Sequence, residues 1–79
     1  MYYIYVIQSL IHGTRYVGNT ENIAKRLYEH NLGKCHYTNG RRPWKLIYKE
    51  HYQTRIEATK REKFLKSGQG RKFLDSLLK

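Results

Sequence analysis

The chain has 79 residues, which fits a single domain of residues 1–79 with one modest core and no separate substrate-binding domain. Its 16 Lys and Arg against 6 Asp and Glu give a formal net charge of +10, which favours a polyanionic partner over a merely solubilising surface. No stretch approaches the roughly 18–20 apolar residues of a membrane-spanning helix. The one cysteine, Cys35, excludes an internal disulfide and fits a cytoplasmic location.

The start of the chain predicts a β-hairpin. Residues 2–8 are mostly aromatic and β-branched, a composition typical of a strand, and residues 14–18 predict a second strand. The segment 9–13 between them predicts a turn, in which Gly13 can take a left-handed conformation. The two strands are therefore expected to pair in antiparallel fashion.

A helix is expected to follow the hairpin, over residues 21–31. Thr20 precedes it and belongs to the residue types that cap helix N-termini. Ile23, Leu27 and His30 recur at three- to four-residue spacing and so share one face. This face is expected to pack against the sheet.

A loop and a third strand come next. Gly33 ends the helix, and residues 34–43 are polar, basic and glycine-containing, which predicts a loop. Residues 44–52 alternate well enough for a strand. The alternation places three large side chains on one face of it: Trp44, Leu46 and Tyr48.

Two more helices are expected at the end of the chain. Thr54 and Glu57 form a capping box for a helix that runs to Lys66, and residues 67–70 interrupt it. A short C-terminal helix then carries an apolar stripe of Phe73, Leu74, Leu77 and Leu78. The order β-β-α-β-α-α predicts an α/β fold, in which a small three-stranded antiparallel sheet is flanked by helices.

Two tyrosine-bearing segments and a pair of helix residues carry the main functional signal. Segments 3–5 (Tyr-Ile-Tyr) and 16–18 (Tyr-Val-Gly) occupy the two strands of the hairpin, and Arg26 and His30 are neighbours on the following helix. A cationic and donating pair at the edge of a core needs an anionic partner, and Arg is well shaped to hold two phosphate oxygens. The set of two phenols, a guanidinium and an imidazole therefore suits chemistry on a phosphodiester.

Four segments in this order resemble the GIY-YIG nuclease family. They resemble in particular its small stand-alone members, which are similar to the N-terminal nuclease domain found in excinuclease ABC. The segments are 3–5, 16–18, 26–31 (Arg-Leu-Tyr-Glu-His-Asn) and 61–66 (Arg-Glu-Lys-Phe-Leu-Lys), and the likeness covers nearly the whole chain. The resemblance implies a metal-dependent endonuclease that hydrolyses DNA phosphodiester bonds with Mg²⁺ or Mn²⁺, in DNA repair or recombination.

The resemblance also implies a set of catalytic residues: Tyr5, Tyr16, Arg26, His30 and Glu62. Tyr5 and Tyr16 would position or deprotonate the attacking water, and a nearby cation such as Arg26, or a metal, would lower the pKa of a phenol and make the phenolate accessible. Arg26 would also neutralise the charge that develops on the phosphoryl oxygens, and His30 would assist through a hydrogen bond or proton transfer. The sequence leaves open which phenol acts as the base.

Glu62 is the expected metal ligand. Glu57 is already explained by the capping box, whereas Glu62 borders the inward-facing stripe of its helix. A carboxylate there fits Mg²⁺, which proteins commonly hold through one or two carboxylates together with water and substrate phosphate. The alternative is an exposed Glu62 that pairs with Lys66, one helical turn away.

The chain departs from the family pattern at several positions. Tyr3 replaces the Gly of the first motif, which adds bulk without removing chemistry. Asn19 follows the second motif, where Ser or Thr is common. The asparagine found late in several family members has two candidates here, Asn31 and Asn39.

Basic side chains outside the catalytic set are expected to bind the nucleic-acid backbone. They are Lys34, His36, Arg41, Arg42, Lys45, Lys63 and Lys66. DNA is the expected partner, RNA stays open, no membrane partner is expected, and a separate protein could supply specificity. Two rival functions also stay open: a non-catalytic basic module that binds nucleic acid, and an interaction domain that uses the fold as a scaffold.

Overall fold

The structure, a computed structural model, describes residues 1–78. Within this range three strands form one antiparallel sheet in the order β2-β1-β3, and four helices flank it. The strands are β1 (Tyr2–Ser9), β2 (Arg15–Thr20) and β3 (Trp44–Tyr52). The helices are α1 (Ile23–Asn31), α2 (His36–Asn39), α3 (Arg55–Lys66) and α4 (Gly68–Leu77). None of these helices is long and apolar enough to cross a membrane.

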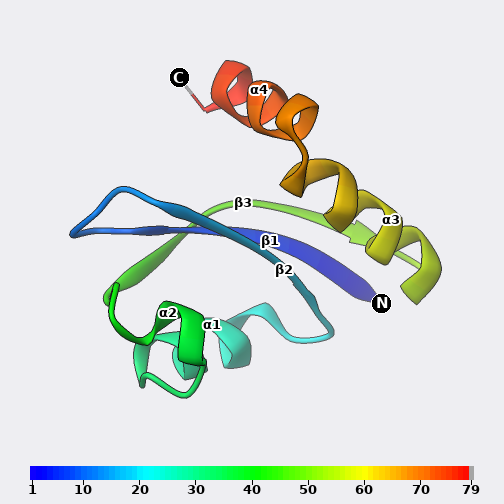
Figure 1. The fold of residues 1–79 in the computed structure, drawn as a ribbon. Coiled ribbons are helices and arrows are strands. Elements are labelled where there is room, and N and C mark those ends of the chain that lie inside the picture. The colour runs from blue at the N-terminus through cyan, green and yellow to red at the C-terminus, as the bar shows by residue number, and fades with distance from the viewer. Residues whose placement is uncertain (79) are drawn as a thin grey trace.

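The helices form two layers, one on each face of the sheet. Figure 1 shows α1 and α2 on one side and α3 and α4 on the other, with β2 and β3 as the edge strands. The predicted α/β class, the antiparallel sheet and the order β-β-α-β-α-α are confirmed. One element is new: the four-residue helix α2 lies in the segment 34–43 that was predicted to be a loop.

The sheet separates two clusters of buried side chains, because successive residues of β1 point to opposite faces. Ile4 and Val6 pack towards α3 and α4, in a cluster with Val17, Ala58, Leu65 and Leu74. Tyr5 and Ile7 point to the α1 face, in a cluster with Trp44, Tyr16, Ile23, Leu27 and Leu46. The aromatic part of the predicted site thus belongs to the second cluster.

A register shift in the β1–β3 pairing overturns one prediction. Val6 lies opposite Tyr48 and Ile7 opposite Leu46, so Ile47 is an extra residue in β3. Tyr48 consequently packs on the α3/α4 face, whereas Leu46 packs on the α1 face. The expectation that Trp44, Leu46 and Tyr48 share one face is therefore wrong.

Capping residues define where the helices begin and end. The N-cap of α1 is Asn22, whose Oδ1 accepts a hydrogen bond from the backbone N–H of Lys25 at 3.0 Å. The predicted cap, Thr20, instead accepts from the backbone N–H of Asn22 at 3.1 Å. Gly33 follows the helix with φ +83°, a left-handed conformation that suits glycine. Helix α1 therefore starts later than predicted and ends as predicted.

Ser67 lies at the junction of α3 and α4 and caps both helices. It is the C-cap of α3, and its side chain accepts from the backbone N–H of Gly70 at the start of α4. Gly70 is buried, and a Cβ there would overlap the backbone of Phe64 and Leu65. The close approach of the two helices therefore depends on a glycine at this position.

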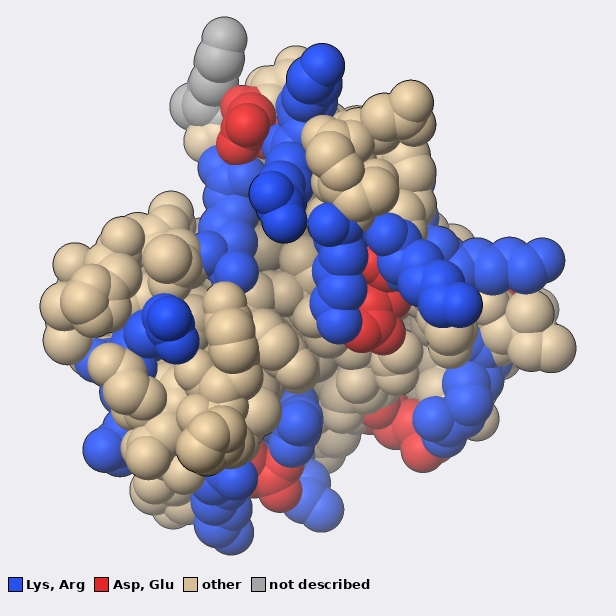
Figure 2. All heavy atoms as spheres, viewed as in Figure 1, with Lys and Arg blue, Asp and Glu red and all other residues tan. Residues whose placement is uncertain are grey.

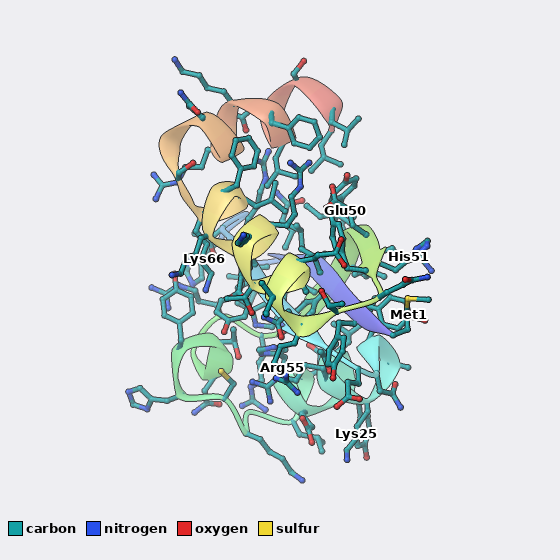
Figure 3. All side chains as sticks on the ribbon, turned by 90° about the vertical axis from the view of Figure 1, so that its right-hand side faces the viewer. Met1, Lys25, Glu50, His51, Arg55 and Lys66 are labelled. Atoms are coloured by element: carbon teal, nitrogen blue, oxygen red, sulfur yellow. The ribbon has the colours of Figure 1, made fainter. Side chains whose placement is uncertain are left out.

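A polar network joins β3 to α3. Nε and Nη2 of Arg61 donate to the two carboxylate oxygens of Glu50 at 2.9 and 3.0 Å, and the hydroxyls of Tyr52 and Tyr48 donate to the same carboxylate. Burial disfavours the ionised carboxylate of Glu50 and so raises its pKa. The hydrogen bonds have the larger effect and hold the pKa of the carboxyl below its usual value. Figure 3 shows Glu50 and Lys66 on opposite sides of α3, so this network holds the helix from the side away from Lys66.

The first prediction concerns this network. Because folding lowers the pKa of Glu50, its contribution to stability is present above the usual carboxyl pKa and is lost as the pH falls through the folded value. Glu50→Gln is expected to reduce the free energy of unfolding at pH 7 by about 1–3 kcal/mol. The difference from wild type should shrink below about pH 4 in urea titrations. Glu21→Gln, at an exposed carboxylate, is the control, and a difference that persists unchanged to pH 3 would contradict the assignment.

The second prediction compares two glycines of α4. Gly70→Ala is expected to lower the free energy of unfolding by at least about 2 kcal/mol, because the new methyl group meets backbone atoms that cannot move aside. Gly68→Ala has open space around its Cβ and should leave stability unchanged or raise it by up to about 1 kcal/mol. Thermal and urea unfolding measure both, and equal effects would contradict the proposed helix contact.

Candidate active site

Tyr5 packs closely against the neighbouring strand because a glycine there has no side chain. It lies on β1 directly opposite Gly18 of β2, and a Cβ at Gly18 would collide with the Tyr5 ring and hydroxyl. Tyr16, also on β2, has its ring centroid 6.4 Å from that of Tyr5. The two tyrosines of the predicted motifs are therefore neighbours, and the Gly that follows the second tyrosine makes the room for the first.

His30 reaches the same place from α1. It is fully buried, its Nε2 lies 2.9 Å from the Tyr5 hydroxyl, and its Nδ1 lies 2.7 Å from Oγ1 of Thr38 on α2. The His30 and Tyr16 rings meet edge to face at 5.1 Å. Burial, followed by the positive charge of Arg26, lowers the pKa of His30 below its usual value. The imidazole is therefore neutral at neutral pH.

The environment of Tyr5 corrects one expectation. Burial is the largest influence on its phenol and raises the pKa to about 12, although Arg26 acts in the opposite direction. Tyr5 is only 2% exposed, so the desolvation that disfavours a phenolate wins over the nearby cation. The expectation that Arg26 would make the phenolate accessible is wrong for Tyr5. Tyr16, which is partly exposed, is the phenol that a substrate can reach.

Arg26 lies at the outer boundary of this buried group. Its side chain is 37% exposed and donates to Oε1 of Glu29 at 3.2 Å. The same guanidinium influences the Tyr5 phenol on its inner side. Arg26 is therefore close enough to the buried phenol to affect its pKa, while its side chain stays partly exposed and could meet an anionic ligand.

Glu62 approaches from the other face of the sheet. Its Oε1 accepts from Nδ2 of Asn19 at 2.5 Å, and its Oε2 accepts from Nζ of Lys66 at 2.7 Å. The predicted alternative, a Glu62–Lys66 pair, is thus present in the structure. The Glu62 side chain is only 19% exposed, however, so it is not a free surface charge. Sequence reasoning missed the role of Asn19 as a partner of this carboxylate.

Lys66 connects the two halves of the site around the edge strand β2. Its Nζ lies 5.8 Å from the centre of the Tyr16 ring while it pairs with Glu62. Within residues 1–78, Glu62 makes no hydrogen bond to Tyr5, Arg26 or His30. The structure therefore brings four predicted residues together on the α1 face and joins the fifth to them through a lysine.

A basic cavity opens beside Tyr16. It has a volume of about 560 Å³, and its lining includes Tyr16 and Tyr37, the cations Arg15, Lys66 and Arg71, and one acid, Asp75, which pairs with Arg15 at 2.6 Å. The ring of Tyr37 lies 5.5 Å from that of Tyr16. Figure 2 shows Lys and Arg side chains gathered over α3 and α4, with few acidic side chains among them. The surface next to the partly exposed phenol of Tyr16 is thus suited to a polyanion.

The other basic residues of the expected binding surface are spread more widely. Arg41 stacks on the Tyr37 ring at 4.9 Å, whereas Arg42 donates to backbone carbonyls of Asn39 at 3.0 Å and Asn31 at 3.4 Å. Lys45 is on β3, which β1 separates from β2. The remaining members are exposed or half-buried side chains, in the α1–α2 segment and on α3: Lys34, His36 and Lys63.

The asparagines expected to match the late family residue have different places. The side chain of Asn31 holds the backbone of Trp44, accepting from its N–H at 2.6 Å and donating to its carbonyl at 3.1 Å. Asn39 is exposed at the end of α2. Asn31 thus fixes the start of β3, and Asn19 is the asparagine that contacts the predicted metal ligand.

The donor set at Glu62 limits the kind of metal site that could form. Among residues 1–78, no three His, Cys, Asp or Glu side chains are grouped so as to hold a metal ion. A single carboxylate with water and substrate phosphate is nevertheless a common arrangement for Mg²⁺. The ammonium of Lys66 already neutralises Glu62. The residues therefore fit an ion held through one carboxylate and not a closed cage of protein ligands.

Comparison with known proteins identifies the family of the chain. The model of the GIY-YIG catalytic domain matches residues 1–73. The UPF0213 protein DP2720 of Desulfotalea psychrophila is 43% identical over 67 residues, which cover 82% of this chain and 60% of that protein. The UPF0213 protein lwe0147 of Listeria welshimeri is 47% identical over 64 residues, which cover 80% of this chain and 70% of that protein.

A solved structure shows the same fold. The solution NMR structure of the UPF0213 protein BH0048 from Bacillus halodurans superimposes with a TM-score of 0.58 at 31% sequence identity, covering 98% of this chain and 85% of that chain. The match to the catalytic-domain model spans both tyrosine motifs, the Arg26/His30 helix and Glu62. The chain therefore belongs to the GIY-YIG nuclease family.

Proposed function

We propose that the protein is a metal-dependent endonuclease that hydrolyses phosphodiester bonds in DNA. The observation that carries the proposal is the meeting of Tyr16 and the Glu62–Lys66 pair at the edge of β2, beside a basic cavity. A partly exposed phenol, a carboxylate and cationic groups are the chemistry that phosphodiester hydrolysis needs. A place in DNA repair or recombination follows from the family resemblance alone.

The proposed role of each side chain follows from how deeply it is buried. Tyr16 is proposed to position or deprotonate the attacking water, since it is the phenol open to solvent. Arg26 is proposed to neutralise charge on the phosphoryl oxygens. Tyr5 is protonated and His30 is neutral and buried, so both are proposed to hold the outer groups in place. The sequence left open which phenol acts on the water and whether His30 assists through a hydrogen bond or proton transfer, and the proposal chooses Tyr16 and a hydrogen bond.

Glu62 is proposed to hold Mg²⁺ or Mn²⁺, with Asn19 orienting its carboxylate. When bound, the ion would supply Lewis-acid polarisation of a phosphoryl oxygen. Lys66 must then release at least part of its ion pair with Glu62, and its ammonium is placed to move to a substrate phosphate. The basic side chains around the cavity would hold the adjoining backbone.

One observation favours a second candidate, a non-catalytic module that binds nucleic acid. The Glu62 carboxylate is already paired with Lys66, and a permanently neutralised carboxylate would have no need of a metal. This candidate predicts affinity that falls steeply with salt concentration, with no dependence on Glu62. Cleavage and metal-binding measurements separate it from the nuclease.

The third prediction is a cleavage assay on supercoiled plasmid and structured DNA with Mg²⁺ or Mn²⁺. Wild type should nick the substrate, and Tyr16→Phe, Arg26→Ala and Glu62→Gln should each lower the rate by about a hundredfold or more, because each removes a group that acts on the reacting phosphate. Single-turnover rates measure the loss. Each variant should unfold as cooperatively as wild type.

Matched controls remove a phenolic hydroxyl, a cationic group and a carboxylate charge away from the site. They are Tyr28→Phe, Lys60→Ala and Glu21→Gln, all at exposed or half-buried positions, and each should cleave within about twofold of wild type because surface changes away from the site have small effects. Equal rates in wild type and in all three site variants would refute the nuclease. DNA binding without cleavage in the presence of either metal ion would support the non-catalytic binding module.

The fourth prediction concerns Lys66. Its ion pair competes with a metal for Glu62, so Lys66→Gln should bind Mn²⁺ about two- to fivefold more tightly while binding DNA more weakly. Titration calorimetry or electron paramagnetic resonance of Mn²⁺ measures the first effect without any cleavage. Glu62→Gln is the control that should abolish binding at this site. Unchanged or weaker Mn²⁺ affinity in Lys66→Gln would contradict the competition.

A further inference from the structure

Thr38 is a buried polar residue that neither the sequence motifs nor the proposed mechanism uses. It lies on α2 and is fully buried. Its hydroxyl lies 2.7 Å from Nδ1 of His30 and 3.4 Å from the backbone carbonyl of Cys35. Its backbone carbonyl makes a different contact: it accepts a hydrogen bond from Nε1 of Trp44 at 2.9 Å. The hydroxyl therefore acts on His30 independently of the backbone contact that anchors α2.

The available donors and acceptors determine the direction of each hydrogen bond among Tyr5, His30 and Thr38. Tyr5 has one phenolic proton, and the groups next to its oxygen are Nε2 of His30 and the guanidinium of Arg26. A guanidinium can only donate, and Tyr5 is too buried for water to accept the proton. Nε2 of His30 must therefore be the acceptor, so this nitrogen carries no hydrogen.

The remaining proton of His30 then belongs to Nδ1. The neutral imidazole has one N–H, and burial together with Arg26 keeps this ring neutral. Nδ1–H donates to Oγ1 of Thr38, and the Thr38 hydroxyl donates its own proton to the carbonyl of Cys35. With the opposite tautomer, the buried phenolic proton of Tyr5 would have no acceptor, which is costly.

We propose that Thr38 is a positioning residue that, by accepting the Nδ1 proton, fixes the tautomer of His30 together with Tyr5 and thereby stabilises the inward orientation of the Tyr5 hydroxyl. With the phenolic proton directed inward to His30, the lone pairs of the Tyr5 oxygen are left for Arg26. The Arg26 guanidinium, which already pairs with Glu29, can then also donate to this oxygen. The effect of Thr38 on cleavage rests on the proposed nuclease function, but its effect on the His30 tautomer does not.

The fifth prediction tests the tautomer directly. In ¹⁵N-labelled wild type, long-range ¹H–¹⁵N correlation spectra of the His30 ring should show a protonated Nδ1 and an unprotonated Nε2 at neutral pH. Thr38→Val keeps the shape of the side chain but has no oxygen to accept the Nδ1 proton, so the ring should shift towards the Nε2–H form or a mixture. Thr38→Ser keeps the hydroxyl and should retain the wild-type pattern.

Cleavage kinetics provide a second test of the role of Thr38. Thr38→Val should lower the single-turnover rate by about ten- to a hundredfold, as expected for the loss of one buried hydrogen bond, and should leave DNA affinity unchanged. Thr38→Ser should restore the rate to within about threefold of wild type, since a purely steric role would not be rescued by the smaller side chain.

Three results would overturn the proposal: an Nε2–H tautomer in wild type, an unchanged tautomer in Thr38→Val, or equal impairment in the Ser and Val variants. The wild-type spectrum alone decides the matter if the Val variant does not fold. Absence of cleavage in wild type with the expected tautomer would count against the nuclease and not against the positioning role of Thr38.

Discussion

The ion pair between Lys66 and Glu62 at the edge of β2 is the interaction on which the functional account depends. The sheet divides the molecule, so an acid on α3 and the phenols on the α1 face would ordinarily be kept apart. Because β2 is an edge strand, a side chain can pass around it, and Lys66 does so by pairing with Glu62 while it lies near the Tyr16 ring. Both helix layers thereby contribute to one surface.

Burial explains why the residues of the family motifs differ in what they can do. Tyr5 and His30 are enclosed, so one stays protonated and the other neutral. Tyr16, Arg26 and Lys66 lie at the boundary with solvent, where a phosphate can reach them. The role that we propose for the buried pair, rigid support of the outer groups, agrees with the rule that reactive side chains work best when neighbouring groups fix their orientation.

The sequence was sufficient to predict the strands, the long helices and the tyrosine, Arg26 and His30 group, because hydrophobic periodicity and motif spacing are local signals. It could not predict α2, since a single turn in a polar, basic segment is too short to show periodicity. The extra residue in β3 depends on pairing with β1, and the Asn19–Glu62 contact joins residues distant in the chain. The raised pKa of Tyr5 was missed for the same reason, because burial is a property of the folded packing.

The central claim is that a divalent ion bound at Glu62 lies beside Tyr16, and paramagnetic relaxation by Mn²⁺ tests it most directly. In ¹⁵N- and ¹³C-labelled protein, small additions of Mn²⁺ should broaden the Asn19 side-chain amide and the Tyr16 ring first, and Glu62→Gln should abolish the effect. Broadening centred on other carboxylates such as Asp75, or equal broadening in wild type and Glu62→Gln, would contradict the account.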